Sequence, residues 1–239
     1  IDFSPNFNLA AGQKAPIITS EKPNELSLSH FGFTPFWAKK RTYVINARAE
    51  GDHNKENDPN YTGSKGIIKK PFFRAAIRKQ RCLIPADAFI EGTTKEKLDK
   101  PYLVYMENGA RPFAFAGIYD EWIDKESGEV YPNFAIITCR PNPLLQKVPH
   151  HRMPLILDES NYKEWLNQET ALAEVTSLLE PFDHRKMNAY PIDAAIKRVK
   201  TNSREALKAI GKPLIEHAEF SIENSLELLG MGESRHKKT

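Results

Sequence analysis

The sequence predicts an α+β fold in a single domain, and three observations support this class. Strand-like stretches rich in aromatic and β-branched residues are mixed with short amphipathic stretches, without the regular alternation of a doubly wound parallel sheet. No internal repeat, low-complexity segment or Gly/Ser linker divides the 239 residues. Hydrophobic residues make up 40% and charged residues 27%, as in ordinary globular proteins. We therefore expect one domain over residues 1–234 and a frayed basic tail at 235–239.

The first part of the chain is expected to contain little helix. Residues 1–30 are interrupted by three prolines and predict extended and loop structure. The polar stretch 52–66, crowded with Asn, Asp, Pro and Gly, predicts a long surface loop. Pro71 suits the first turn of a helix, and the apolar run 82–84 predicts a brief strand that Pro85 stops.

The second part contains the clearest strand patterns. Aromatic and β-branched residues predict strands at residues 102–106, 113–119, 134–138 and 153–157. One helix, containing Trp165 and Val175, is expected to end before Pro181. Another is expected to begin at Asn202, because Glu205 three residues later completes a loose capping box.

Composition excludes several classes of protein. The only cysteines, Cys82 and Cys139, lack CxxC or zinc spacing, which favours a reducing compartment and predicts no metal site. No apolar run is long enough to span a bilayer, and the start at Ile1 does not resemble a signal peptide. We therefore expect a cytoplasmic protein with no membrane partner and no cofactor. The net charge of +3 is compatible with nucleic-acid binding.

Two stretches have the residue types of a single-strand binder. Residues 31–41 place Trp37 and other aromatics beside Lys39 and further cations, so that bases could stack while cations track phosphates. Residues 65–81 contain seven cations, Arg74 among them, and no acid. The alternatives are that the aromatics belong to the core and that the basic stretch is a solvated helix face.

Two further positions suggest proton transfer. Glu91 follows an apolar strand, where exclusion of water would raise its pKa and suit it to act as a general acid. His150 and His151 precede another apolar stretch, beside Arg152, which can hold a phosphate. On a strand the two histidines would point apart, so we do not expect them to share a metal.

Taken in order, these motifs resemble the SRAP family, the SOS-response-associated peptidases that process abasic sites. Family motifs correspond here to Asn-Ala-Arg-Ala-Glu at 46–50, Arg-Cys-Leu-Ile-Pro at 81–85, His-His-Arg-Met-Pro at 150–154, and a closing segment over 190–202. The resemblance implies a mixed, largely antiparallel bifurcated sheet with a barrel-like core surrounded by helices. It also implies a monomeric sensor of abasic sites in single-stranded DNA, acting in the DNA damage and SOS responses and, in a bacterium, associated with the nucleoid.

The resemblance implies a covalent mechanism as well. Family members begin Met-Cys-Gly-Arg, and loss of the initiator Met, which can be self-catalysed, exposes a cysteine that closes a thiazolidine with the abasic aldehyde. The sequence begins at Ile1, and the family-like region starts near Phe7. We therefore expect the native Met-Cys segment to be missing, and crosslinking to require its restoration.

Roles for individual residues follow from the same resemblance. Glu91 would open the sugar ring, and His150 would assist formation and lyase-like reversal of the Schiff base. Asn46 would orient the N-terminal residue, while Arg48 and Arg152 would hold flanking phosphates.

Two other functions are compatible with the residues. One is a cysteine peptidase or hydrolase that pairs Cys82 or Cys139 with His150. The other is a passive single-strand-binding protein in which Glu91 and His150 are structural.

Overall fold

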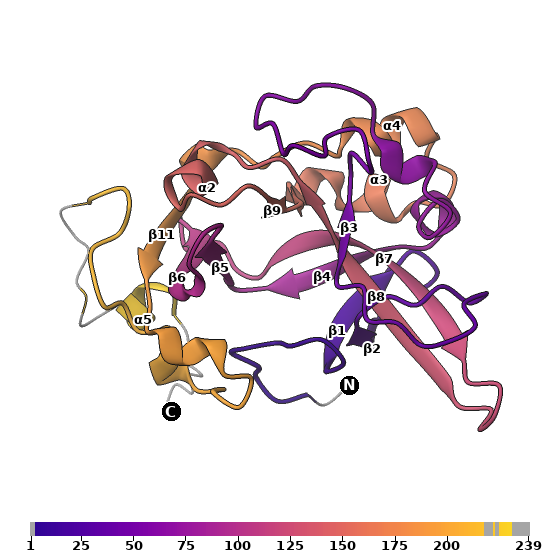
Figure 1. Cartoon of the computed structure of the whole chain (residues 1–239), viewed down its shortest axis with the longest axis horizontal. Coiled ribbons are helices and arrows are strands. Elements are labelled where there is room, and N and C mark those ends of the chain that lie inside the picture. The colour runs from indigo at the N-terminus through magenta and orange to yellow at the C-terminus, as the bar shows by residue number, and fades with distance from the viewer. Residues whose placement is uncertain (1–2, 218–221, 223–224, 231–239) are drawn as a thin grey trace, which may run out of the picture.

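The computed structural model describes residues 3–217, 222 and 225–230, and within them the strands form two sheets (Figure 1). The larger sheet contains β1 (Lys14–Thr19), β2 (Leu26–Phe31), β3 (Asn46–Arg48), β4 (Arg81–Ala86), β7 (Phe113–Ile123), β8 (Val130–Cys139), β9 (Met153–Pro154) and β10 (Ile156–Leu157). The smaller, antiparallel sheet contains β5 (Phe89–Thr93), β6 (Lys97–Met106) and β11 (Met187–Pro191). The helices are α1 (Ala76–Lys79), α2 (Pro143–Lys147), α3 (Tyr162–Leu166), α4 (Leu172–Ser177) and α5 (Ser225–Leu228).

The larger sheet is mixed and curls back on itself. Its β7 strand pairs antiparallel with both β4 and β8, whereas β8 pairs parallel with β2 and β3. The β7–β8 hairpin is long and projects beyond the body of the molecule (Figure 1). This arrangement confirms the predicted α+β class and its mixed sheet, although the helices are short and lie beside the sheets rather than enclosing them.

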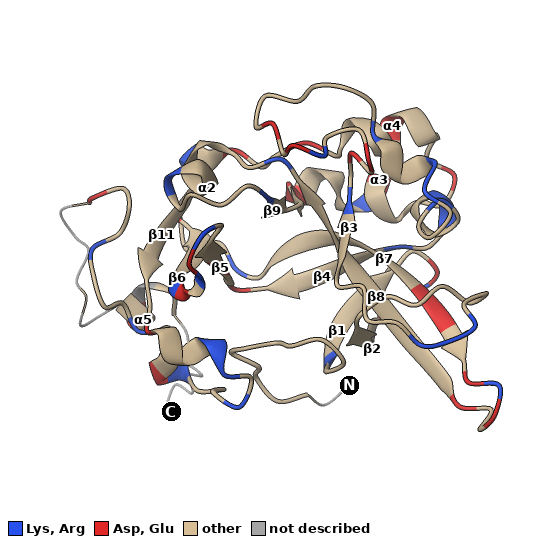
Figure 2. Cartoon of the chain, viewed as in Figure 1, with Lys and Arg blue, Asp and Glu red and all other residues tan. Residues whose placement is uncertain are grey.

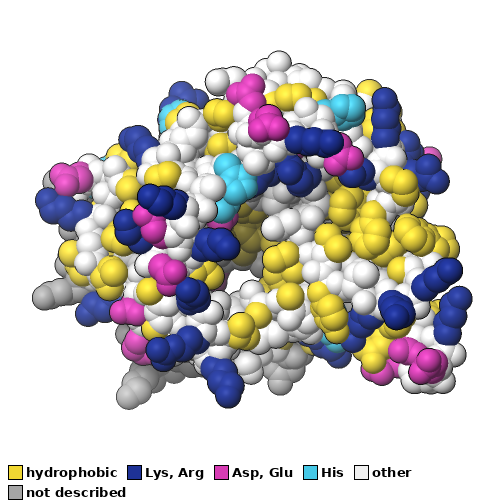
Figure 3. Space-filling view, in the orientation of Figure 1, with side chains coloured by type: hydrophobic (Ala, Val, Ile, Leu, Met, Phe, Trp, Pro, Cys, Tyr) yellow, Lys and Arg dark blue, Asp and Glu magenta, His cyan; other side chains and the backbone are white. Residues whose placement is uncertain are grey.

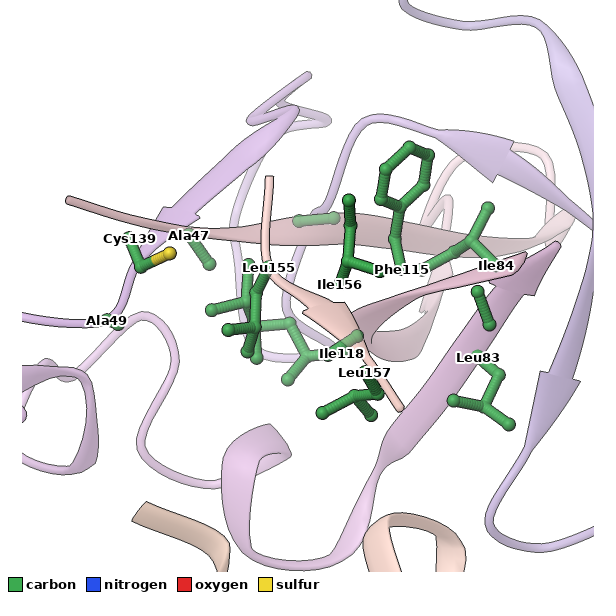
Figure 4. Close-up of a cluster of buried hydrophobic side chains, with 14 of the residues drawn as sticks. Ala47, Ala49, Leu83, Ile84, Phe115, Ile118, Cys139, Leu155, Ile156 and Leu157 are labelled. Atoms are coloured by element: carbon green, nitrogen blue, oxygen red, sulfur yellow. The ribbon is translucent and has the colours of Figure 1, made fainter. Parts of the chain in front are cut away.

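The smaller sheet separates two hydrophobic clusters because its side chains alternate. On β6, Val104 and Met106 belong to the main core, while Leu103 and Tyr105 belong to a second cluster. The main core fills the curl of the larger sheet with side chains from most of its strands (Figure 4). The same alternation on β5 directs Glu91 towards the main-core side of the sheet.

Two boundaries predicted from prolines, a strand end at Pro85 and a helix start at Pro71, differ from the structure. Pro85 does not stop its strand, because β4 continues to Ala86. On one side of β4, β1 reaches only Cys82 and Leu83, so Pro85 lies where that side has no partner strand and a missing N–H is tolerated. Pro71 begins a run of turns, and α1 starts only at Ala76.

Two helix predictions were also wrong in detail. The helix expected to end before Pro181 is split into α3 and α4. Between them, the Asn167 side chain accepts a hydrogen bond from the amide of Glu169, a local turn that competes with the helix. No α-helix begins at Asn202, because its side chain accepts a hydrogen bond from the amide of Phe7.

The loop predicted at residues 52–66 is confirmed. Within the described ranges, no helix is both long and apolar enough to cross a membrane. The basic tail predicted at residues 235–239 lies outside the described residues.

Candidate functional site

Glu91 and His150 meet where the smaller sheet approaches the end of the larger one. Glu91 lies on β5, and His150 lies in the loop between α2 and β9. The Oε1 of Glu91 is 3.4 Å from the Nε2 of His150, and these side chains are only 23% and 18% exposed. The other ring nitrogen of His150, Nδ1, is 2.6 Å from the carbonyl oxygen of Gly92. On the face shown in Figure 3, histidine side chains lie at the rim of a hollow.

The surroundings of this pair favour its uncharged form. Burial raises the pKa of Glu91 to about 8, against a smaller opposing effect of the Gly92 amide. Burial, assisted by the nearby His151 and Arg152, lowers the pKa of His150. At neutral pH Glu91 is therefore protonated and His150 neutral. Because Nδ1 of His150 donates to the Gly92 carbonyl, Nε2 is the acceptor that faces the Glu91 proton.

Two arginines predicted to hold phosphates lie together beside Thr138. Arg48 is paired with Thr138 across β3 and β8, and its guanidinium donates to the carbonyl of Asn54 at 2.6 Å. Arg152 donates to the Thr138 carbonyl at 2.7 Å, and its Nη1 is 2.8 Å from Oε2 of Glu50. Since Arg152 is only 8% exposed, its guanidinium already holds protein groups in place. Sequence reasoning assigned no role to Glu50, although it closes the motif at 46–50 and pairs with Arg152.

Asn46, predicted to orient an N-terminal residue, lies on a short strand of the larger sheet. It is exposed on β3, where it is paired with Ile136. Only Ala47 separates it from Arg48, so both side chains project from the same face of the strand. Among the described residues, no hydrogen bond or ion pair joins Asn46 to Glu91 or His150.

The predicted aromatic stretch contains both core and exposed residues. Phe33 is fully buried, whereas Phe36 and Trp37 are 63% and 51% exposed. The exposed loop is held from β7: an Asp120 carboxylate oxygen accepts from the Phe36 amide at 2.9 Å, and the Trp122 indole donates to the Ala38 carbonyl at 2.9 Å. Large aromatic groups are thus presented to solvent on a fixed backbone.

The structure brings this loop against the basic stretch. The Trp37 ring packs edge-on against Phe72, with 5.9 Å between ring centroids, and Arg74 follows two residues later. Most cations of the stretch have partners. Three form the ion pairs Lys65–Glu180, Lys70–Asp52 and Lys79–Glu169, and a fourth, Arg81, is buried. Lys39, Lys69 and Arg74 are exposed and form no ion pair within the described part of the chain. Elsewhere Lys and Arg are spread over many elements (Figure 2).

The two histidines do not alternate across a strand as expected. They lie in the loop before β9, where their rings stack with centroids 4.8 Å apart and planes 14° from parallel. Nδ1 of His151 is 2.9 Å from the hydroxyl of Thr94. Sequence reasoning missed Thr94, because only the pairing of this loop with the end of β5 gives it a role.

Neither internal cysteine has the environment of a nucleophile. Cys82 and Cys139 are both fully buried. Burial raises the pKa of Cys139 to about 12 and that of Cys82 well above its usual value. A thiolate, the reactive form, is therefore disfavoured at both positions.

Comparison with known proteins agrees with this arrangement of motifs. The pattern of the SRAP family, described as SOS response associated peptidase, matches residues 1–199. This chain belongs to the SRAP family. Its SRAP relatives include the Bacillus subtilis abasic site processing protein YoqW, 33% identical over 213 residues that cover 87% of this chain and 88% of YoqW. The Escherichia coli abasic site processing protein YedK is 24% identical, covering 85% of this chain and 84% of YedK.

A solved structure shares the SRAP fold of this chain. A crystal structure of a Bacteroides thetaiotaomicron protein matches with a TM-score of 0.70 and 34% identity, covering 84% of this chain and 82% of that protein. The fold and the family of the chain are therefore established together.

Proposed function

We propose that this SRAP protein recognises abasic sites in single-stranded DNA and that Glu91 and His150 carry the proton transfers of a covalent crosslink. Relatives across most of the chain are named abasic site processing proteins. The observation that supports the chemistry is the pairing of a carboxylic acid that keeps its proton near neutral pH with a neutral imidazole. Such a pair can both donate and accept a proton in one reaction.

The proposed reaction begins with the closed sugar of the abasic site. Glu91 protonates the ring oxygen as the ring opens to the aldehyde. The α-amine of an N-terminal cysteine adds to the aldehyde carbon and, with loss of one water, forms a Schiff base. The cysteine sulfur then adds to the imine carbon while its proton passes to the nitrogen, which closes a thiazolidine. His150 accepts and returns the protons that the amine loses, and Asn46 orients the N-terminal residue.

The nucleophile in this proposal is an N-terminal cysteine, since Cys82 and Cys139 are buried with raised pKa values. The sequence begins at Ile1, so the test supplies a segment that begins Met-Cys-Gly-Arg. Removal of that initiator Met by the same site is part of the proposal. Trp37, Lys39 and Arg74 contact the DNA, and Arg48 binds a flanking phosphate, whereas the buried Arg152 supports this part of the site through Thr138 and Glu50.

The test compares binding with crosslinking in the extended chain. Abasic single-stranded DNA is incubated with the parent, Glu91→Gln, His150→Gln and the control Glu126→Gln, an exposed hairpin residue. We expect a denaturant-resistant band with the parent and the control. The crosslinking rate of the two site variants should be lower by a factor of at least about 100, since acid–base catalysis contributes at least that factor. DNA affinity should remain close to that of the parent. No band with the parent, while it still binds the DNA, would contradict the proposal.

A passive single-strand-binding protein is the second candidate, and the exposed Trp37 and Phe36 favour it. These aromatics with Lys39 and Arg74 suffice for binding without chemistry. In that case Glu91→Gln would change binding and adduct formation equally, whereas the proposed chemistry separates the two.

A further inference from the structure

Four contacts join the end of β5 to the loop that carries the histidines. Two involve His150, namely Gly92 O to Nδ1 at 2.6 Å and Glu91 Oε1 to Nε2 at 3.4 Å. The other two involve Thr94, whose amide donates to the Pro149 carbonyl at 3.0 Å and whose hydroxyl is 2.9 Å from Nδ1 of His151. Residues 91–94 and residues 149–151 are therefore held against one another by several contacts.

The His150 ring needs more than its hydrogen bond to stay aligned with Glu91. A single bond at Nδ1 fixes one edge of the imidazole but leaves its plane free to rock about that bond. The stacked His151 ring, only 14° from parallel, restricts this motion from one side. The Thr94 hydroxyl in turn restricts His151.

We propose that Thr94 and His151 are positioning residues that hold the His150 ring in register with Glu91. Neither needs to touch the DNA, since both act through His150. Thr94 is exposed and His151 half-buried, so their contacts are too accessible to water to contribute much to the stability of the fold. Their effect is expected in the alignment of the reacting groups, where small displacements cost large factors in rate. This inference rests on the proposed function of Glu91 and His150.

The charges around the stack add a dependence on pH. His150 faces Glu91, His151 and Arg152, while His151 faces His150, Arg152 and Arg48. Arginine is charged throughout the relevant range, so His151 is the neighbour whose charge changes. A positive charge on His151 disfavours protonation of His150. His150 therefore remains available as a base at lower pH.

The test uses the extended chain and four variants. Thr94→Val removes the hydroxyl at nearly constant volume, Thr94→Ser keeps it, and His151→Leu removes the stack. Thr176→Val is the control, because Thr176 is a half-buried threonine on α4 whose hydroxyl donates to the Ala173 carbonyl, away from the histidines. Crosslinking rate is measured against pH, and the imidazole nitrogens of His150 are titrated by NMR without DNA.

We expect Thr94→Val and His151→Leu to slow crosslinking about tenfold at unchanged DNA affinity. Thr94→Ser should restore the rate, and His151→Leu should move the acid limb of the profile to higher pH. In the NMR titration both disruptive variants should alter the tautomer or titration of His150. If His150 titrates in both variants as in the parent, the proposed positioning role of Thr94 and His151 is refuted. The titration decides this even if the parent forms no adduct, an outcome that would refute the proposed function separately.

Discussion

At Glu91, the burial that keeps the carboxylic acid protonated near neutral pH also costs the folded state stability. An unfolded chain would release this proton near pH 4.5, whereas the folded chain releases it near 8. Between these values the folded state binds more protons than the unfolded state. The contribution of Glu91 to the free energy of unfolding is therefore fully present below pH 4.5, and it is lost progressively as pH rises towards 8.

Glu91→Gln should consequently stabilise the protein while removing its chemistry. Glutamine cannot ionise, so the variant escapes a loss of up to about 1.4 kcal/mol per pH unit in this window. The measurement is urea unfolding of parent and variant between pH 5 and 8, with Glu126→Gln as the control. A stability difference that does not widen with pH would contradict the assigned pKa.

The rate of crosslinking should fall on the basic side. Above about pH 8 Glu91 loses its proton and can no longer serve as the acid. On the acid side, protonation of His150 and of the nucleophilic amine both reduce the rate, and His150 does so only below its usual pKa of 6.5. Single-turnover rates from pH 5 to 9.5 give the profile. A rate that holds constant from pH 7 to 9.5 would exclude Glu91 as the acid.

Among the secondary-structure elements, α1 and α3 are joined at their C-terminal ends by one buried cation. Arg81 is fully buried at the start of β4 and donates to the carbonyls of Ile77, Arg78, Trp165 and Asn167. These carbonyls, at the ends of two helices, lack helical partners of their own. Arg81 satisfies them together, and so fixes how both helices meet the larger sheet.

Arg81→Met should therefore destabilise the fold strongly. The substitution keeps much of the volume but leaves several buried carbonyls without donors, a loss of about 3–5 kcal/mol. Chemical denaturation measures it, with Lys163→Met on the exposed side of α3 as the control, expected to change stability by less than about 0.5 kcal/mol. A small effect of Arg81→Met would show that water replaces the guanidinium at little cost.

Elements were predictable from sequence where local pattern decides them. The aromatic and β-branched runs in β6, β7 and β8 predicted strands that the structure contains. The errors arose where a side chain bonds outside the local pattern. Asn202 accepts from Phe7, which is 195 residues away in the chain, instead of capping a helix. No local window of sequence contains that partner.

In the whole molecule, the candidate site depends on contacts between segments far apart in sequence. Glu91 and His150 were both identifiable, since each lies beside an apolar run within a recognisable motif. The stack on His151 and its bond to Thr94 were not, because they exist only once β5 meets the loop before β9. The ion pairs of the basic stretch could not be predicted either, because partners such as Glu180 and Glu169 lie about a hundred residues away.

The surface formed by Trp37, Lys39 and Arg74 should govern DNA affinity rather than chemistry. Trp37→Ala should weaken single-strand binding by about 1–3 kcal/mol, the usual value of one base stacked on an aromatic ring. Arg74→Ala should reduce the slope of log affinity against log salt by about 0.7, as expected for one phosphate contact. Fluorescence anisotropy over a salt series measures both. Ile123→Ala and Lys125→Ala, on the projecting hairpin, serve as controls, and equal losses in them would rule out this surface.

The most direct test of the central claim is the intact mass of the adduct formed by the Met-Cys-extended chain with abasic single-stranded DNA. We predict a product equal to the processed protein plus the oligonucleotide minus one water, with the linkage in the N-terminal peptide. Replacing the added cysteine by serine should abolish this stable product. An adduct located at Cys82, Cys139 or a lysine, or a parent chain that binds the DNA without any mass increase, would contradict the account.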